Sequence, residues 1–236
     1  MKIIRNAAFW LFILCMPVLL ITTSVRIASN SSELYRYGFS KYGVSQTTGL
    51  PPAELNKAIA GLITYFNSDE EYINLTVVKD SQPFTLFNER EVGHLKDVKG
   101  LFRLVFWLLL GTLIYSFLYA GLNYVLWQDR RRVARALIGG SVLTLGLLIV
   151  MGLMIWVDFD WFFYRFHLLS FANDLWLLNP ATDYLIMLFP QGFWFDATLF
   201  CALGTAAMAL ILGGSGWWRL RKEKAAAVRK PPIQAA

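Results

Sequence analysis

The chain has 236 residues, of which 56% are hydrophobic and 16% aromatic, and its charged residues give a formal net charge of +6. Soluble domains are about 45–50% apolar, and the apolar excess here is gathered in long runs. This pattern excludes an ordinary water-soluble domain and predicts an all-α membrane protein. The positive charge lies beside those runs, so it does not indicate a nucleic-acid-binding face.

Four apolar runs approach or exceed the ~20 residues that a helix needs to cross a membrane. We expect spans over about residues 7–25, 101–127, 136–157 and 195–214. Lys2 and Arg5 precede the first run, as basic residues precede the apolar core of a signal peptide. Its apolar core is longer than the usual ~7–15 residues and no cleavage site follows closely, so we interpret it as an uncleaved anchor. The whole chain, 1–236, is then a single integral membrane domain.

Basic residues are divided unequally between the two sides that four spans define. The side with both termini and the loop after the second span has 12 of the 22 Lys and Arg residues and two acidic residues. The other side has 10 basic and 14 acidic residues. The positive-inside rule therefore places both termini in the cytoplasm. The tail, 215–236, is expected to be cytoplasmic, and disordered from Lys222 onward.

Residues 26–100 are expected to form a small α+β cap on the extracytoplasmic side. Pro51-Pro52 opens a helix in which five apolar residues recur at helical spacing: Leu55, Ile59, Leu62, Ile63 and Phe66. Two short apolar stretches, 73–78 and 83–87, are separated by polar residues and predict a hairpin. A cap of this size is too small for an independent core, so we expect it to pack on the spans.

A helix is predicted to begin beside the second span and to continue into it. Asn88, followed three residues later by Glu91, is a capping signature. In such a helix Arg90, His94 and Asp97 share one face. His94 is then expected about two turns before the apolar core of the span.

Residues 158–194 are too polar to cross a membrane and too apolar for a water-exposed loop. The aromatic residues at the start of this segment are of the type that lies in the headgroup region of a membrane. Asn179-Pro180 predicts the start of a helix that Pro190 ends. That helix is too short to span, so we expect an outer interfacial or re-entrant segment. It contains His167, and His94 is the other histidine of the chain.

Both histidines are thus expected at the outer membrane surface, where imidazole can exchange a proton near neutral pH. Asp97 is the candidate to orient His94, and Arg165 either binds a phosphate or extends its charge to the interface. A lone interfacial histidine is more often structural, and that interpretation stays open. A zinc site fits the ligand types but no local spacing supports it. We therefore predict no metal and no cofactor, and we interpret Cys15 and Cys201 as packing residues.

Short motifs around the two histidines resemble the lipoprotein intramolecular transacylase family of bacterial membrane proteins. They are Glu91-x-x-His94-x-x-Asp97-Val98, Phe166-His167, Phe171-x-Asn173-Asp174-x-Trp176, Pro180-x-x-Asp183-x-Leu185-Ile186 and Phe189-Pro190. The resemblance covers nearly the whole chain. Leu95 stands where the family often has Met, a departure that leaves the histidine unchanged.

The resemblance implies transfer of an acyl chain from the glyceryl group of a diacylglyceryl lipoprotein to the α-amino group of its N-terminal cysteine. It implies that His94 and His167 are the functional histidines, on the extracytoplasmic side of the bacterial cytoplasmic membrane. Exchanging an ester for an amide is downhill and needs no ATP. Around the two histidines, further residues are expected to orient groups, stabilise the oxyanion or position substrate: Asp97, Arg165, Glu91, Asn173 and Asp174.

The expected partners are a diacylglyceryl lipoprotein and membrane lipid, without nucleic acid, and the protein is expected to be a monomer. Two alternatives stay open. One is a non-enzymatic lipid-binding or assembly factor of the outer leaflet, with structural or pH-sensing histidines. The other is a phospholipase or an intermolecular acyltransferase.

Overall fold

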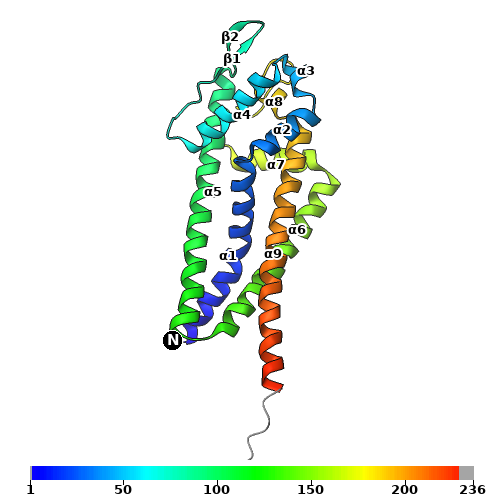
Figure 1. The fold of residues 1–236 in the computed structure, drawn as a ribbon. Coiled ribbons are helices and arrows are strands. Elements are labelled where there is room, and N and C mark those ends of the chain that lie inside the picture. The colour runs from blue at the N-terminus through cyan, green and yellow to red at the C-terminus, as the bar shows by residue number, and fades with distance from the viewer. Residues whose placement is uncertain (1, 229–236) are drawn as a thin grey trace, which may run out of the picture. The chain divides into compact units, whose positions relative to one another are not determined.

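The structure is a computed structural model that describes residues 2–228, and these residues are mostly helical (Figure 1). In chain order the elements are α1 (Lys2–Ser29), α2 (Ser32–Lys41), α3 (Val44–Thr48), α4 (Pro52–Asn67), β1 (Thr76–Lys79), β2 (Gln82–Thr85), α5 (Glu89–Gly121), the π-helical turn η1 (Leu122–Leu126), α6 (Arg130–Val157), α7 (Phe159–Ser170), α8 (Tyr184–Leu188) and α9 (Gln191–Val228).

Four long helices have the length and composition of membrane spans. They are α1, α5 with η1, α6 and α9, and their most apolar windows have mean hydropathies of 1.9 to 2.3. None of the window in α5 is buried inside the protein. Helices that expose so much apolar surface need lipid rather than water around them. The predicted helical membrane fold with four spanning helices is therefore confirmed at this level.

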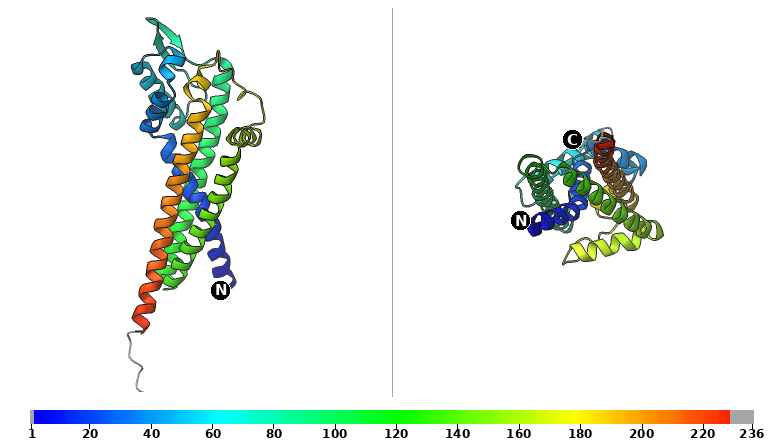
Figure 2. Two further views of the ribbon diagram at one scale, coloured as in Figure 1. Left: turned by 90° about the vertical axis from the view of Figure 1, so that its right-hand side faces the viewer. Right: turned by 90° about the horizontal axis from the view of Figure 1, so that it is seen from below.

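The chain divides into two compact units. The first comprises Met1–Thr23, Trp107–Gly152 and Ala202–Ala236, and the second comprises Ser24–Phe106 and Leu153–Cys201. In the first unit, parts of the four long helices pack together, and Figure 2 shows these helices from two further directions. Their buried core includes Phe12, Met16, Leu20, Tyr119 and Ala136.

Small residues allow the helices of the first unit to approach one another closely. A Cβ atom added at Gly140 would lie 2.5 Å from the sulfur of Met16 on α1. A Cβ at Gly216 of α9 would lie 2.6 Å from the carbonyl oxygen of Ala134 on α6. Glycine at such contacts brings the helix backbones together, which favours association in lipid.

The second unit has its own apolar core around α2, α4 and α8. On α4, the predicted apolar face is buried at Leu55, Ile59 and Leu62. The loop residue Leu50 and Leu188 of α8 are fully buried in the same cluster. The helix that Pro51-Pro52 was expected to open therefore forms and buries its apolar side.

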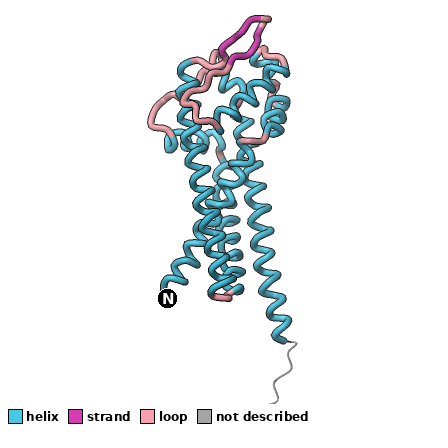
Figure 3. The backbone as a smooth tube through the Cα atoms, turned by 60° about the vertical axis from the view of Figure 1, so that its left-hand side comes forward, coloured by secondary structure: helices cyan, strands magenta, loops and turns pink. Residues whose placement is uncertain are grey.

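The predicted hairpin is also present. β1 and β2 pair antiparallel, from Thr76 opposite Thr85 to Lys79 opposite Gln82 (Figure 3). The turn residues Asp80 and Ser81 have φ angles of 50° and 63°. Two consecutive left-handed residues are typical of the two-residue turns whose twist matches paired strands.

The predicted disorder from Lys222 onward and one predicted helix start are wrong. α9 continues to Val228, past the expected end of the fourth span at 214, so residues 222–228 are helical. Glu223 accounts for the extension, because it pairs with Arg219 one turn earlier on α9 and with Arg131 of α6. The rest of the expected disordered tail, 229–236, lies outside the described residues.

The helix expected to begin at Asn179-Pro180 begins only at Tyr184, with Asp183 as its N-cap. The Asn179 side chain instead accepts a hydrogen bond from the backbone N–H of Ala181, and the Asn179 carbonyl accepts one from Thr182. Asparagine forms such local turns as readily as it caps helices. The same residues therefore make a turn ahead of α8.

Candidate active site

The start of α5 fixes the position of the first histidine. The side chain of Glu91 accepts the backbone N–H of Asn88 at 2.7 Å, and the side chain of Asn88 accepts the backbone N–H of Glu91 at 3.0 Å. This reciprocal pair is the predicted capping box, and it satisfies donors that a helix start otherwise leaves free. His94 follows three residues after Glu91, and is 7% exposed.

The second histidine lies on α7. Asp158 caps this helix by accepting the backbone N–H of Trp161 at 2.9 Å. His167 in the last turn of α7 is 8% exposed. The ring centroids of His94 and His167 are 6.1 Å apart. The two histidines, 73 positions apart in the sequence, therefore form a buried pair within the second unit.

Aromatic rings surround this histidine pair. The ring of Phe171 lies 4.9 Å from that of His94 and 5.5 Å from that of His167. Trp176 lies 4.9 Å and Phe163 4.4 Å from the His167 ring. These rings limit access of water to the imidazoles and give the site an apolar wall suited to an acyl chain.

The Nδ1 atom of His167 lies 2.8 Å from the carbonyl oxygen of Phe163, one turn earlier on α7. A carbonyl only accepts, so this contact requires the proton on Nδ1 and leaves a lone pair on Nε2. Burial lowers the pKa of His167 below its ordinary value, although the hydrogen bond to Phe163 opposes this shift. His167 is thus a neutral imidazole at pH 7 with Nε2 able to take a proton.

His94 differs in its hydrogen bonding. Its Nδ1 atom is buried and has no hydrogen-bond partner among the described residues. Burial lowers the pKa of His94 from 6.5 to about 4, with the nearby His167 adding to the shift and Asp97 opposing it. The histidine lies seven residues ahead of the apolar run that begins at 101. His94 is therefore also neutral at pH 7.

The segment after α7 is tied to α5 beside the histidine pair. The carbonyl oxygen of Asp174 accepts a hydrogen bond from the Arg90 guanidinium at 2.6 Å. Asn173 donates its side-chain N–H to the Asp97 carboxylate at 2.9 Å. These contacts hold the backbone between Phe171 and Trp176, the two residues whose rings cover the histidines.

A second set of contacts ties α5 to the start of α8. Glu91, 1% exposed, accepts the backbone N–H of Leu185 at 2.6 Å through its other carboxylate oxygen. Asp183 accepts hydrogen bonds from the side chain of Asn88 at 3.1 Å and the backbone N–H of Asn179 at 2.7 Å. Burial raises the pKa of Glu91, and the backbone donors oppose this shift. Glu91 thus acts here as a structural acceptor.

Two of the predicted supporting residues have different surroundings from those expected. Asp97 makes its hydrogen bond to Asn173, and among the described residues none joins it to His94. Asn173 bonds to only one of the two carboxylate oxygens, so the predicted role of Asp97 in orienting the His94 ring stays a prediction. Arg165 is exposed, with its guanidinium 5.4 Å over the ring of Trp161. No described hydrogen bond or ion pair brings it to either histidine.

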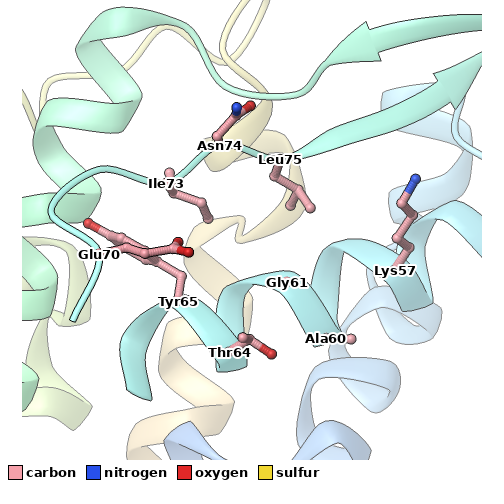
Figure 4. Close-up of a pocket in the computed structure, with 9 residues that line it drawn as sticks. All are labelled: Lys57, Ala60, Gly61, Thr64, Tyr65, Glu70, Ile73, Asn74 and Leu75. Carbon is pink, nitrogen blue, oxygen red and sulfur yellow. The ribbon is translucent and has the colours of Figure 1, made fainter. Parts of the chain in front are cut away.

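Within residues 2–228 there is no group of three His, Cys, Asp or Glu side chains placed to hold a metal ion. The zinc alternative therefore has no ligand set in this part of the chain. A cavity of about 310 Å³ in the second unit is lined by residues of α4 and of 70–75, among them Lys57, Gly61 and Glu70 (Figure 4). Neither histidine lines this cavity.

Sequence reasoning missed the hydrogen bonds of Arg90 and Asp183, and the packing of the aromatic rings on the imidazoles. Arg90 shares a helix face with His94, and that spacing was a usable signal. Phe171 and Trp176 are part of the motifs that carry the family resemblance. What was missing is their contact with the ring of His167, which depends on a turn between α7 and α8.

Together these features define a helical membrane protein with a pair of buried, neutral histidines enclosed by aromatic rings. Residues 10–194 match the family model described as lipoprotein intramolecular transacylase Lit. The match covers well over half of the chain, and the chain therefore belongs to this family, whose name denotes an acyl transfer.

Solved structures of a transacylase from Bacillus cereus have the same fold. The membrane integral lipoprotein intramolecular transacylase Lit of that organism is 17% identical, with a TM-score of 0.81 over 95% of this chain and 100% of the other. A variant of it with one histidine replaced by arginine is 16% identical, with a TM-score of 0.76 over 95% of this chain and 96% of the other. At this identity the likeness concerns the fold alone.

A curated relative from Aquifex aeolicus (strain VF5) is described as an uncharacterized protein. It is 28% identical over 117 residues, which make up 50% of each chain. The match therefore spans about half of the length of that relative, and its description adds no activity.

Proposed function

We propose that this protein moves an acyl chain from the diacylglyceryl group of a lipoprotein to the α-amino group of the lipoprotein's own N-terminal cysteine. The observation that carries the proposal is the pair His94 and His167, buried among aromatic rings with their own ring centroids 6.1 Å apart. At this separation both rings have hydrogen-bond reach to a single reacting ester placed between them. Family membership supports the reaction class.

In the proposed first step the α-amine attacks the ester carbonyl and forms a C–N bond. The amine must lose a proton for this bond to persist, and the Nε2 lone pair of His167 accepts that proton. Its Nδ1–H continues to donate a hydrogen bond to the carbonyl oxygen of Phe163, and this bond stabilises the imidazolium that forms. Amine and ester belong to one substrate molecule, so their effective concentration is high.

His94 is proposed to stabilise the negative charge that develops on the ester oxygen. Its Nδ1 faces no donor or acceptor among the described residues, and an unpaired buried N–H costs free energy. A neutral ring avoids this cost by carrying its proton on Nε2 instead. Nε2–H is then a donor available to the tetrahedral oxyanion.

The tetrahedral intermediate collapses by breaking the bond between the carbonyl carbon and the glyceryl oxygen. The imidazolium of His167 returns its proton to that leaving oxygen. The products are an N-acyl lipoprotein and a free glyceryl hydroxyl, so no proton or co-reactant is left over. The exchange of an ester for an amide is downhill and needs no cofactor.

The proposal places this chemistry on the extracytoplasmic side of a bacterial cytoplasmic membrane, with both chain termini in the cytoplasm. The charge distribution of the sequence supports this orientation. Both histidines belong to one chain, so a monomer suffices for the reaction. The supporting roles go to Asn173 and Asp174, which hold the aromatic cover on α5 through Asp97 and Arg90.

The test is mass spectrometry of lipoprotein N-terminal peptides from cells that lack other N-acylation. Cells expressing the wild type should contain the N-acyl, S-monoacylglyceryl form, and those expressing His94→Ala or His167→Ala should keep the diacylglyceryl form. The matched control is Leu169→Ala, because Leu169 is a residue of α7 with 89% of its surface exposed and has no proposed role in the site. Full transacylation by His167→Ala would refute the mechanism.

A second arm separates the remaining alternatives. The purified protein is given phospholipid alone, and then phospholipid with a diacylglyceryl lipopeptide. Release of fatty acid from phospholipid alone indicates a phospholipase, and N-acylation with an acyl chain from labelled phospholipid indicates an intermolecular acyltransferase. An unchanged diacyl pattern, with the protein confirmed in the membrane, favours a non-enzymatic lipid-binding factor.

A further inference from the structure

A polar cavity in the first unit lies where α6 begins. It has a volume of about 380 Å³ and is lined by residues 127–131 together with Arg5 of α1 and Glu223 of α9. All of these residues belong to the first unit, whereas both histidines belong to the second. The cavity is therefore a separate feature from the candidate active site, and the proposed transacylation gives it no role.

The two carboxylates that line this cavity already have basic partners. Asp129 accepts a hydrogen bond from the guanidinium of Arg5 at 2.9 Å. Glu223 accepts one from Arg131 at 2.6 Å and forms an ion pair with Arg219 at 3.3 Å. The acidic groups of the cavity are thus matched, and they leave no free negative charge for a further cation.

Arg130 is the cavity residue with unmatched charge. Its guanidinium lies 5.5 Å over the ring of Tyr124, and no carboxylate pairs with it among the described residues. Three arginines, Arg5, Arg130 and Arg131, therefore line the cavity against two carboxylates. The excess positive charge favours an anion.

A buried hydrogen-bond donor of a cavity residue also lacks an acceptor. The Nε atom of Arg5, which lines the cavity, is buried and has no partner among the described residues. Buried donors in proteins are nearly always paired, so an orphaned one indicates an acceptor that belongs there. Besides this donor, α6 begins at Arg130 and runs for 28 residues, and its N-terminus adds positive partial charge.

We propose that this cavity binds a phosphate group, supplied by the headgroup of an anionic phospholipid or by a soluble organic phosphate. A phosphodiester oxygen matches the forked donors of Arg130 and Arg131. Trp127, which also lines the cavity, is of the residue type that gathers at the membrane–water interface. Basic pockets beside spanning helices are suited to such headgroups.

The experiment uses the purified full chain in neutral detergent and counts bound lipids by native mass spectrometry. Phosphatidylglycerol and phosphatidylcholine are added in equal amounts, because both carry phosphate and only the first is anionic overall. The wild type should retain phosphatidylglycerol in preference. Arg130→Gln should lower that preference about fivefold, which is the contribution of one basic side chain near an anionic surface.

Arg221→Gln is the matched control. Arg221 is a basic residue of the same unit whose guanidinium also rests on an aromatic ring, that of Trp217, at 5.2 Å, and it does not line the cavity. The control removes the same charge and should keep the preference. Arg130→Lys retains the charge and should recover part of the binding, and melting temperatures without lipid verify that each variant is folded.

A third arm identifies the source of the phosphate. Glycerol 3-phosphate is added at millimolar concentration to delipidated protein, and the change in melting temperature is compared between the wild type and Arg130→Gln. Stabilisation by this solute that depends on Arg130, without any preference for phosphatidylglycerol, supports a soluble phosphate. An equal loss of lipid preference in Arg130→Gln and Arg221→Gln, or no dependence on Arg130 for either ligand, would overturn the proposal.

Discussion

The two histidines of the site have the same chemistry but are held by different means. The Nδ1 of His167 bonds to a carbonyl of its own helix, so its tautomer is set within α7 alone. The Nδ1 of His94 has no hydrogen-bond partner within residues 2–228, and its protonation depends on what surrounds it on α5 and α7. An internal hydrogen bond thus fixes one ring as a base before substrate arrives. The other ring has no such bond, and its proton is placed on Nε2 only by the cost of an unpaired buried Nδ1–H.

This difference predicts unequal effects of the same substitution. His167→Gln removes the base and should lower the rate of transacylation about a thousandfold or more, within the range attributed to general base catalysis. His94→Gln keeps an N–H donor in the pocket, so we expect a smaller loss of about ten- to hundredfold, below the cost of losing an oxyanion donor entirely. The measurement is the rate at which the reconstituted protein converts a diacylglyceryl lipopeptide to the N-acyl, S-monoacylglyceryl (lyso) form.

His94→Ala, which lacks the donor, should be slower than His94→Gln and thereby separates loss of the donor from loss of the ring. Comparable expression of all variants in the membrane is the control. The reverse order, with His94→Gln the more damaging glutamine variant, would assign the base to His94.

The aromatic cover of the pocket should matter less than the histidines and more than the rest of α7. Trp176→Ala removes a ring that lies 4.9 Å from that of His167 and admits water to the imidazole. We expect kcat/KM to fall about tenfold, since better solvation weakens every electrostatic contact of the site. Trp161→Ala is the matched control, because Trp161 is an exposed tryptophan of α7, the helix that carries His167. Equal losses for both would show that the ring near His167 has no special role.

The bond between Asp97 and Asn173 should give a still smaller effect. Asp97→Asn and Asn173→Ala each loosen the same attachment of the covering segment to α5, and each should lower the rate a few-fold. Asp97→Asn removes the charge from this hydrogen bond and Asn173→Ala removes the bond itself, so the double variant should be no slower than the slower single variant. A loss for Asp97→Asn as large as that for His94→Ala, with Asn173→Ala near wild type, would instead support the expected orienting role of Asp97.

Local sequence patterns predicted the features that depend on residues close together in the chain. The capping box of Asn88 and Glu91 forms as expected because its hydrogen bonds join residues within one turn. The face of α4 and the hairpin likewise follow from spacing and turn residues. The four spans follow from the length of their apolar runs. Both histidines belong to motifs that resemble those of the family, and no such signal existed for the cavity at the start of α6.

The sequence was not enough where a side chain has a partner far away in the chain, or where it can form either of two local structures. Asp97 lies three residues after His94 on the same helix, yet its carboxylate accepts from Asn173, 76 positions further along the chain. The side chain of Asn179 could either cap a helix or stabilise a turn, and in the structure it stabilises a turn. The extension of α9 depends on Arg131 of another helix, which no window of the sequence contains.

The smallest predicted effect concerns pH and the buried state of His94. Burial lowers the pKa of His94 to about 4 and also lowers that of His167, whereas the unfolded chain protonates its histidines near pH 6.5. Between these values the unfolded chain binds more protons, so stability should fall as the pH drops below about 6.5 and be insensitive to these groups above it. We expect the melting temperature to decrease from pH 7 to pH 5 by a few degrees less in His94→Gln than in the wild type. Fluorescence-detected melting in detergent measures this. An identical decrease in both proteins would mean that water reaches the His94 ring, which would remove the reason for placing its proton on Nε2.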